Sequence, residues 1–252
     1  MMNYFLHKIE EIGLLFQIRW AEIKSGFILR FFVLPLFLLS FLLFFKLSQF
    51  NLDPIGSFYL LTGNIVLALS VGSISLLMQE IANHKKTRTL ELFTLLPISV
   101  SSYVFALTLA EFCAALPSAM ISFVLGMLLF KCPLNISLAL ILLLPACFLC
   151  SYSIAGLGAF IGLKARNPLE ANLIGQILLY FLAFIIPVMI PENRLPQALA
   201  SIIKFSPVHQ SAWLIRLICF GTLNLETLIL FSVLFIEGTF FLWFCRKSLT
   251  FY

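Results

Sequence analysis

Two carboxylates inside apolar stretches are the side chains most able to do chemistry in this sequence. Glu111 and Glu237 each lie within a run of apolar residues long enough to cross a bilayer. Burying an ionisable group there is costly, so each is a candidate proton site or a partner for a polar group on another helix. Neither has an obvious cationic partner within the apolar runs. A hydrogen-bonding role that holds helices together is the simpler interpretation, and a place on a translocation path is the alternative.

Motifs of catalysis and nucleotide binding are absent from the sequence. It contains no phosphate-binding G-x-x-x-x-G-K-[ST] loop, no H-E-x-x-H and no G-x-S-x-G, and its three histidines lie far apart. Cys147 and Cys150 form a C-x-x-C, but it sits in an apolar run without a second ligand pair, which favours packing over metal binding. We therefore predict no catalytic, metal or cofactor-binding site. A protein that moves a solute uphill would then need a partner or an ion gradient.

A charged stretch between the second and third apolar runs is the most distinctive local feature. Thr89 is a predicted N-cap, and Glu91 is well placed in the first turn to interact with the helix dipole. The predicted helix ends near Pro97. Its apolar residues are Leu90, Leu92, Phe93, Leu95 and Leu96. Such a helix would need a protein groove to cover it, although a loop folded onto lipid headgroups is the alternative.

The elements that carry these residues are membrane-spanning helices. Of 252 residues, 62% are apolar and 11% charged, against about 25% charged in soluble domains. We predict an all-α integral membrane protein with a single domain over residues 1–252. A span needs roughly 20 apolar residues. Six predicted transmembrane helices cover residues 27–45, 58–81, 103–130, 136–163, 172–190 and 225–245.

Three further segments have amphipathic or small-residue patterns. Residues 1–24 carry an apolar stripe, with the charged residues largely off it, which predicts an interfacial helix. Between the fifth and sixth spans, residues 195–203 and 213–220 predict two short helices on the outer leaflet. Gly158 and Gly162, with Ser151, Ala155 and Ala159, predict close helix packing by the fourth span.

The distribution of basic residues predicts the orientation. Of 16 Lys and Arg residues, 11 fall on segments that share one side with the N-terminus and 5 on the other side. The positive-inside rule therefore puts both termini in the cytoplasm of a multi-pass cell-membrane protein. No basic stripe of the kind that binds nucleic acid is present, so lipid is the expected partner of these charges.

The order of several motifs resembles that of type-2 ABC transporter permeases. Glu80, then Thr89-Leu90-Glu91, then Pro97 is similar to the family's cytoplasmic signature of an acidic residue, G-T-x-E and a proline before the third span. Arg88 stands where the family usually has glycine. The second half agrees in the order of Asn172, the 181–187 region, Leu195-Pro196, Leu199, Pro207 and Arg216.

The resemblance implies a permease subunit of an ATP-driven ABC exporter. It would pair with a second permease copy or a paralogue and with a separate ATPase that binds ATP, so this chain itself would not be an enzyme. It implies ATPase-coupling roles for Glu80, Arg88, Thr89, Glu91 and Pro97. Glu111 and Glu237 remain candidates for the translocation path. The alternatives are an ion-coupled secondary transporter using an intramembrane glutamate, and a lipid-modifying membrane enzyme, for which no polar constellation is visible.

Overall fold

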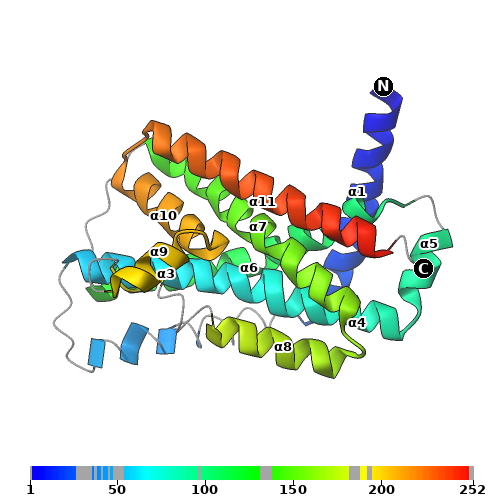
Figure 1. The fold of residues 1–252 in the computed structure, drawn as a ribbon, viewed down its shortest axis with the longest axis horizontal. Helices are drawn as coiled ribbons and strands as arrows, with labels where there is room; N and C mark the ends of the chain where they lie inside the picture. The colour runs from blue at the N-terminus through cyan, green and yellow to red at the C-terminus, as the bar shows by residue number, and fades with distance from the viewer. Residues whose placement is uncertain are drawn as a thin grey trace.

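The computed structural model describes residues 2–26, 36, 39–40, 42–44, 46–47, 54–95, 98–130, 138–181, 188–191 and 195–249. Every regular element in these residues is a helix, as predicted (Figure 1). The longer helices are α1 (Met2–Ser25), α3 (Pro54–Ser70), α4 (Leu77–Lys86), α6 (Val100–Phe130), α7 (Leu143–Lys164), α8 (Pro168–Tyr180), α10 (Pro207–Phe220) and α11 (Leu225–Leu249). The shorter ones are the π-helix η1 (Val71–Leu76), α5 (Thr89–Leu95), the 3-10 helix η2 (Leu138–Leu142) and α9 (Gln197–Ile203).

Four of the helices are long and apolar enough to cross a membrane. They cover Pro54–Lys86, in which α3, η1 and α4 are continuous, Val100–Phe130, Leu140–Lys164 and Leu225–Lys247. These match the predicted second, third, fourth and sixth spans. The predicted first span lies largely outside the described residues, and residues 182–187 of the fifth do as well. Six crossings therefore stay a prediction.

The helix α7 lies at the centre of the bundle, against α11, α4 and α10 (Figure 1). Its glycines allow this close approach. A methyl group on Gly158 would lie 2.7 Å from the carbonyl oxygen of Ser73, and one on Gly162 would lie 2.7 Å from that of Met78. On another face, Gly156 meets Phe241 of α11. The small residues of the fourth span are packing positions, as predicted.

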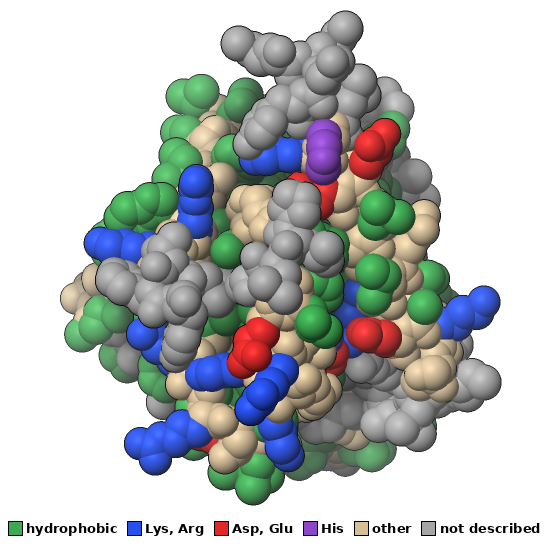
Figure 2. Space-filling model, turned by 90° about the vertical axis from the view of Figure 1, so that its right-hand side faces the viewer, with side chains coloured by type: hydrophobic (Ala, Val, Ile, Leu, Met, Phe, Trp, Pro, Cys, Tyr) green, Lys and Arg blue, Asp and Glu red, His purple; other side chains and the backbone are tan. Residues whose placement is uncertain are grey.

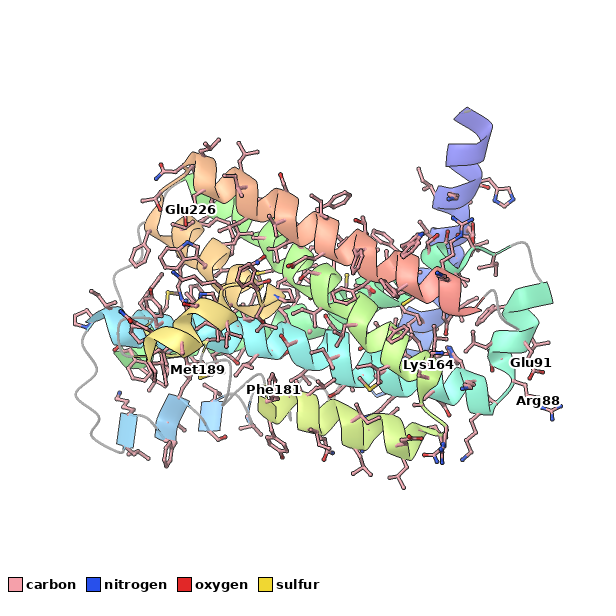
Figure 3. All side chains as sticks on the ribbon, viewed as in Figure 1. Arg88, Glu91, Lys164, Phe181, Met189 and Glu226 are labelled. Atoms are coloured by element: carbon pink, nitrogen blue, oxygen red, sulfur yellow. The ribbon has the colours of Figure 1, made fainter. Side chains whose placement is uncertain are left out.

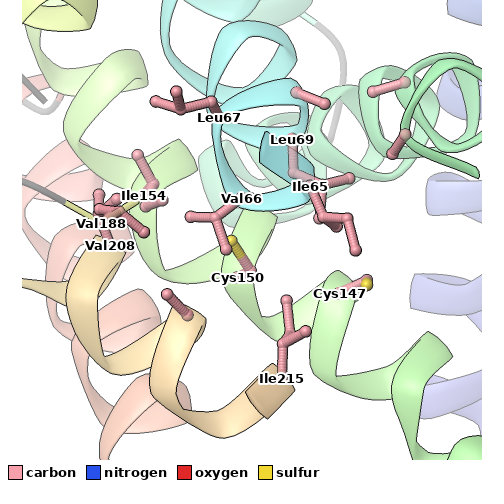
Figure 4. Close-up of a cluster of buried hydrophobic side chains, with 14 of the residues drawn as sticks. Ile65, Val66, Leu67, Leu69, Cys147, Cys150, Ile154, Val188, Val208 and Ile215 are labelled. Atoms are coloured by element: carbon pink, nitrogen blue, oxygen red, sulfur yellow. The ribbon is translucent and has the colours of Figure 1, made fainter. Parts of the chain in front are cut away.

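The helices differ greatly in how much of their surface the bundle buries. In the most apolar 18-residue window, 89% of residues in Pro54–Lys86 are buried but only 17% in Leu225–Lys247. Pro54–Lys86 is therefore a central helix. Leu225–Lys247 keeps most of its apolar surface exposed, where lipid would contact it. Figure 4 shows part of the core, where Val66 of α3, Ile154 and Cys150 of α7, and Ile215 of α10 meet.

The N-terminal helix α1 forms over almost the predicted residues. That its apolar stripe, which includes Ile9 and Ile23, lies on the membrane stays a prediction. Glu11, Leu15, Arg19 and Ile23 are buried, one above another at steps of four residues, and α1 packs on α6. Ile9 of the predicted stripe is 51% exposed.

The two short helices between the fifth and sixth spans are present as α9 and α10, at the end of the bundle opposite α5 (Figure 1). Pro207 occupies the first turn of α10, where its missing N–H is harmless. Gly221 ends the helix with φ 74°, a left-handed conformation that suits glycine. The helix ends before Gly221 as predicted, but it begins at Pro207, six residues before the predicted start at residue 213.

Candidate functional site

The turn between α4 and α5 is built around Arg88. This residue has φ 61°, in the left-handed region that favours glycine. Its carbonyl oxygen accepts hydrogen bonds from the N–H groups of Glu91 and Leu92 at 3.1 and 3.3 Å. Arg88 thus occupies the N-cap position predicted for Thr89, which is instead the first residue of α5. Arginine therefore takes the left-handed conformation at the position where the signature that this sequence resembles has glycine.

A buried charge cluster lies inside this end of the bundle. Arg19, only 4% exposed, reaches from α1 to Glu80 of α4 and Glu111 of α6. Its Nη1 lies 2.8 Å from Oε1 of Glu80, and its Nη2 lies 2.6 Å from Oε1 of Glu111. A third carboxylate, that of Glu22, is 2.9 Å from Nη1. One guanidinium therefore joins three helices.

The carboxylates around Arg19 stabilise its protonated, charged form. Burial lowers the pKa of the guanidinium, but Glu111 and Glu80 outweigh burial, so the pKa of Arg19 lies above its usual value. Glu111 is 1% exposed and takes its counter-ion from outside the apolar runs. The counter-ion of Glu111 is therefore Arg19 of the N-terminal helix α1, which no predicted span contains.

The cluster extends to α5 through His84 and two aromatic rings. His84 contacts Glu80 through Nε2 at 3.1 Å and shares a 2.6 Å hydrogen bond with the Tyr103 hydroxyl through Nδ1. Phe93 of α5 packs against both, with ring centroids 6.1 Å from His84 and 5.3 Å from Tyr103. A displacement of α5 would therefore press on the cluster.

Further contacts tie α4 and α1 to the rest of this end. Gln79 donates to Oδ1 of Asn172 in α8 at 2.6 Å. Lys85 donates to the carbonyl oxygens of Leu163 and Ala165, at the end of α7. Oε1 of Glu11 accepts from the N–H of Ser99 at 2.6 Å, just before α6 begins. The α4–α5 unit thus contacts α1, α6, α7 and α8 at this end.

Glu22, Glu80 and His84 also have a spacing that metal ligands can have. Their ligand atoms lie within 4.8 Å of one another. However, Arg19 already contacts both carboxylates, so the arrangement favours an ion pair over a cation site. This cluster therefore positions helices.

The structure brings some of the predicted residues together and leaves others apart. Glu80 and Glu111, predicted for different roles, share Arg19. Arg88 and Glu91 project from the tip of α5 (Figure 3), and Pro97 lies outside the described residues. Glu237 is in α11 and is not a partner of Arg19 among the described ion pairs. The sequence analysis missed Arg19 itself, whose signal is its place in the 11-15-19-23 series.

A second buried arginine joins elements at the opposite end. Arg216 of α10 is 1% exposed; it donates through Nε to Oγ1 of Thr62 at 3.0 Å and through Nη2 to the carbonyl of Val188. Its guanidinium also lies 3.8 Å from the centre of the Tyr59 ring. Arg216, one of the residues on which the family resemblance rests, therefore connects α10 to α3 and to the end of the predicted fifth span.

Long apolar helices around a core, with buried arginines at both ends, define a multi-pass membrane protein. The model of the ABC-2 family of transporter proteins matches residues 46–245, which is most of the chain. The chain belongs to this family of type-2 ABC transporter permeases, the membrane subunits of ABC transporters. A comparison with curated proteins found no match.

Proposed function

We propose that this chain is a permease subunit of an ATP-driven exporter and that a separate ATPase docks on the α5 end. The observation that carries the proposal is the two-sided nature of α5. Leu90 is 8% exposed and Phe93 reaches the charge cluster, whereas Leu92 is 62% exposed and Glu91 points outward. An exposed leucine beside a carboxylate on a short projecting helix suits a groove in another protein.

The charges at this end support its location in the cytoplasm. Figure 2 views the end directly and shows Lys and Arg side chains gathered on it. Basic residues occupy the last turns of α1, α4, α7 and α11: Lys24, Lys85, Lys86, Lys164, Arg246 and Lys247. Positive charge beside span ends favours the cytoplasmic side, so both termini would be cytoplasmic.

The helix α1 would add to the docking surface. Leu14 and Ile18 are 62% and 53% exposed, on a side of α1 that does not face α6. The opposite side holds Arg19 in the cluster. Contact with an ATPase would therefore act on α1 and α5 at the same time. Both helices contact the charge cluster around the guanidinium of Arg19.

Motion would then pass from the ATPase to the spans through the cluster. A shift of α5 displaces Phe93 against His84 and Tyr103, and His84 contacts Glu80 on the central helix. Arg19 carries the shift on to Glu111 in α6. With a second permease copy or a paralogue, such shifts would alternately expose a path between the two halves to each side of the membrane.

Co-purification with an ABC ATPase tests the proposal. The permease is co-expressed with the ABC ATPases of its own source organism and captured by an affinity tag, and the bound ATPase is quantified. We expect Glu91→Lys and Leu92→Ala to reduce the bound ATPase. Glu226→Lys, a charge reversal at the opposite end (Figure 3), is the matched control and should retain it. Absence of any ATPase with the wild type, or equal effects of the two charge reversals, would refute docking at α5.

A further inference from the structure

An apolar cavity of about 320 Å³ lies between α3, α6 and α7. It is in the half of the bundle away from α5, since its walls come from the second half of α6 and the first residues of α7. Ile65 of α3 and Cys147 of α7, which line it, are neighbours in Figure 4. Phe123 and Met127 of α6 form much of the remaining wall. The charge cluster is not part of this cavity.

The chemistry of the cavity selects an apolar occupant. Its volume falls within the roughly 300–1,000 Å³ typical of ligand sites. Its lining side chains are apolar, and such cavities exclude water but accept hydrocarbon. Met120, Val124 and Leu144 line it and are also 55%, 49% and 55% exposed, so it opens sideways from the bundle. In a membrane that opening faces acyl chains, and flexible methionines adapt to them.

A lysine lies near one end of the cavity wall. Leu42, which is fully buried, forms a small apolar cluster with Leu60 and Leu61, and Phe123 and Met127 of the cavity wall pack against this cluster. One helical turn further along the chain, Lys46 is exposed, and its Nζ donates to the carbonyl oxygen of Leu129 at 3.0 Å. Leu129 precedes the last residue of α6, so the ammonium lies where this span leaves the hydrocarbon. An apolar slot with a cation at its surface end matches an amphiphile with an anionic head.

We propose that this cavity binds one acyl chain of an anionic phospholipid, whose phosphate pairs with Lys46. The charge complementarity between Lys46 and a phosphate distinguishes this occupant from a neutral lipid or a purely apolar solute. The lipid would fill the space between α6 and α7 and would stabilise their packing at the end opposite the charge cluster. The site is independent of ATPase docking.

Native mass spectrometry of the purified protein in detergent tests the site. Phosphatidylglycerol and phosphatidylcholine with identical chains are titrated separately, and bound lipid is counted. We expect the wild type to bind phosphatidylglycerol roughly fivefold more tightly, as one surface lysine would give. Lys46→Gln should lose this preference and keep the binding of phosphatidylcholine. Lys204→Gln, at another exposed lysine of the same end, should keep the preference.

Variants that fill the cavity provide a second test of the proposal. Val124→Trp places a ring in the opening and should reduce the binding of both lipids, whereas Leu128→Trp should not. Leu128 is 71% exposed on the same helix but does not line the cavity. Met120→Phe replaces Val124→Trp if the latter is not monodisperse. Equal lipid binding by the filled and control variants, or a headgroup preference that survives Lys46→Gln, would overturn the proposal. So would a lipid-free wild-type dimer that Val124→Trp dissociates, because a second copy would then cover the cavity.

Discussion

Arg19 contacts carboxylates from three helices, so its removal deprives the buried Glu111 and the partly buried Glu80 of their shared cation. We expect Arg19→Gln to destabilise the protein by about 3–5 kcal/mol, the usual cost of breaking a buried ion pair from one side. Thermal unfolding in detergent measures this. Glu22→Gln is the control, because Glu22 is 46% exposed and its pair should be worth about 1 kcal/mol or less.

A compensating change separates the loss of charge balance from the loss of packing. Adding Glu111→Gln to Arg19→Gln removes one of the carboxylates that lost the guanidinium, so the double variant should be more stable than Arg19→Gln alone. Arg19→Lys should fall between the wild type and Arg19→Gln, because an ammonium lacks the fork that reaches two carboxylates at once. A double variant no more stable than the single one would show that the ion pair is not what the site depends on.

Arg88 bears backbone strain that glycine would relieve. A left-handed conformation costs a residue with a Cβ about 1–2 kcal/mol. We therefore expect Arg88→Gly to slow hydrogen exchange at the amides of α5, in proportion to a gain of about 1 kcal/mol. Lys86→Gly, in the last turn of α4, should have the opposite sign, because glycine is unfavourable within a helix by about 1 kcal/mol. Faster exchange in Arg88→Gly would contradict the strain.

At the scale of elements, α7 is the helix whose packing depends most on small residues. Gly158→Ala would bring a methyl group against the backbone of Ser73, which cannot rotate away. We expect a loss of about 1–3 kcal/mol from this overpacking, seen as a lower melting temperature in fluorescence-detected chromatography. Gly13→Ala in α1 meets nothing within 4 Å and should stabilise the protein slightly. Equal effects of the two substitutions would show that α7 is not closely packed.

Much of the helix layout could be predicted because hydropathy and helix breakers act locally. The described spans, α5, α9 and α10 all lie close to their predicted residues. Pro207 and Gly221 mark the ends of α10 through backbone rules that hold in any context. The short apolar helix around Leu90 and Phe93 was also predictable, because a polar turn on one side and Pro97 on the other isolate it.

The charge cluster could not be predicted in the same way. On α1, the predicted apolar stripe holds Phe5, Ile9, Ile12, Phe16, Trp20 and Ile23, whereas Glu11, Leu15 and Arg19 lie beside it. Hydrophobicity alone gives no reason to bury Arg19. This residue is buried because Glu111 and Glu80, distant in sequence, supply the counter-charges that make its burial tolerable. Only the tertiary arrangement reveals that match.

We expect the two ends of the whole molecule to lie on opposite sides of the membrane, with the α5 end in the cytoplasm. Glu91→Cys marks the α5 end, and Leu223→Cys, at a residue 52% exposed between α10 and α11, marks the other. With a maleimide that does not cross membranes, intact cells should label Leu223→Cys, and Glu91→Cys should react only after lysis. The wild type controls for the native cysteines. The reverse pattern would invert the proposed orientation and remove α5 from any cytoplasmic partner.

In the proposed mechanism, Arg19 carries motion from α5 to Glu111 in α6. Hydrogen–deuterium exchange of the permease–ATPase complex, with and without trapped nucleotide, tests it most directly. In the wild type, ATPase binding should protect α5, and nucleotide should change exchange in α6 around Glu111. In Arg19→Lys, which keeps the charge and loses the fork, protection of α5 should remain while the response of α6 fades. A full response of α6 in this variant would contradict a coupling role for Arg19.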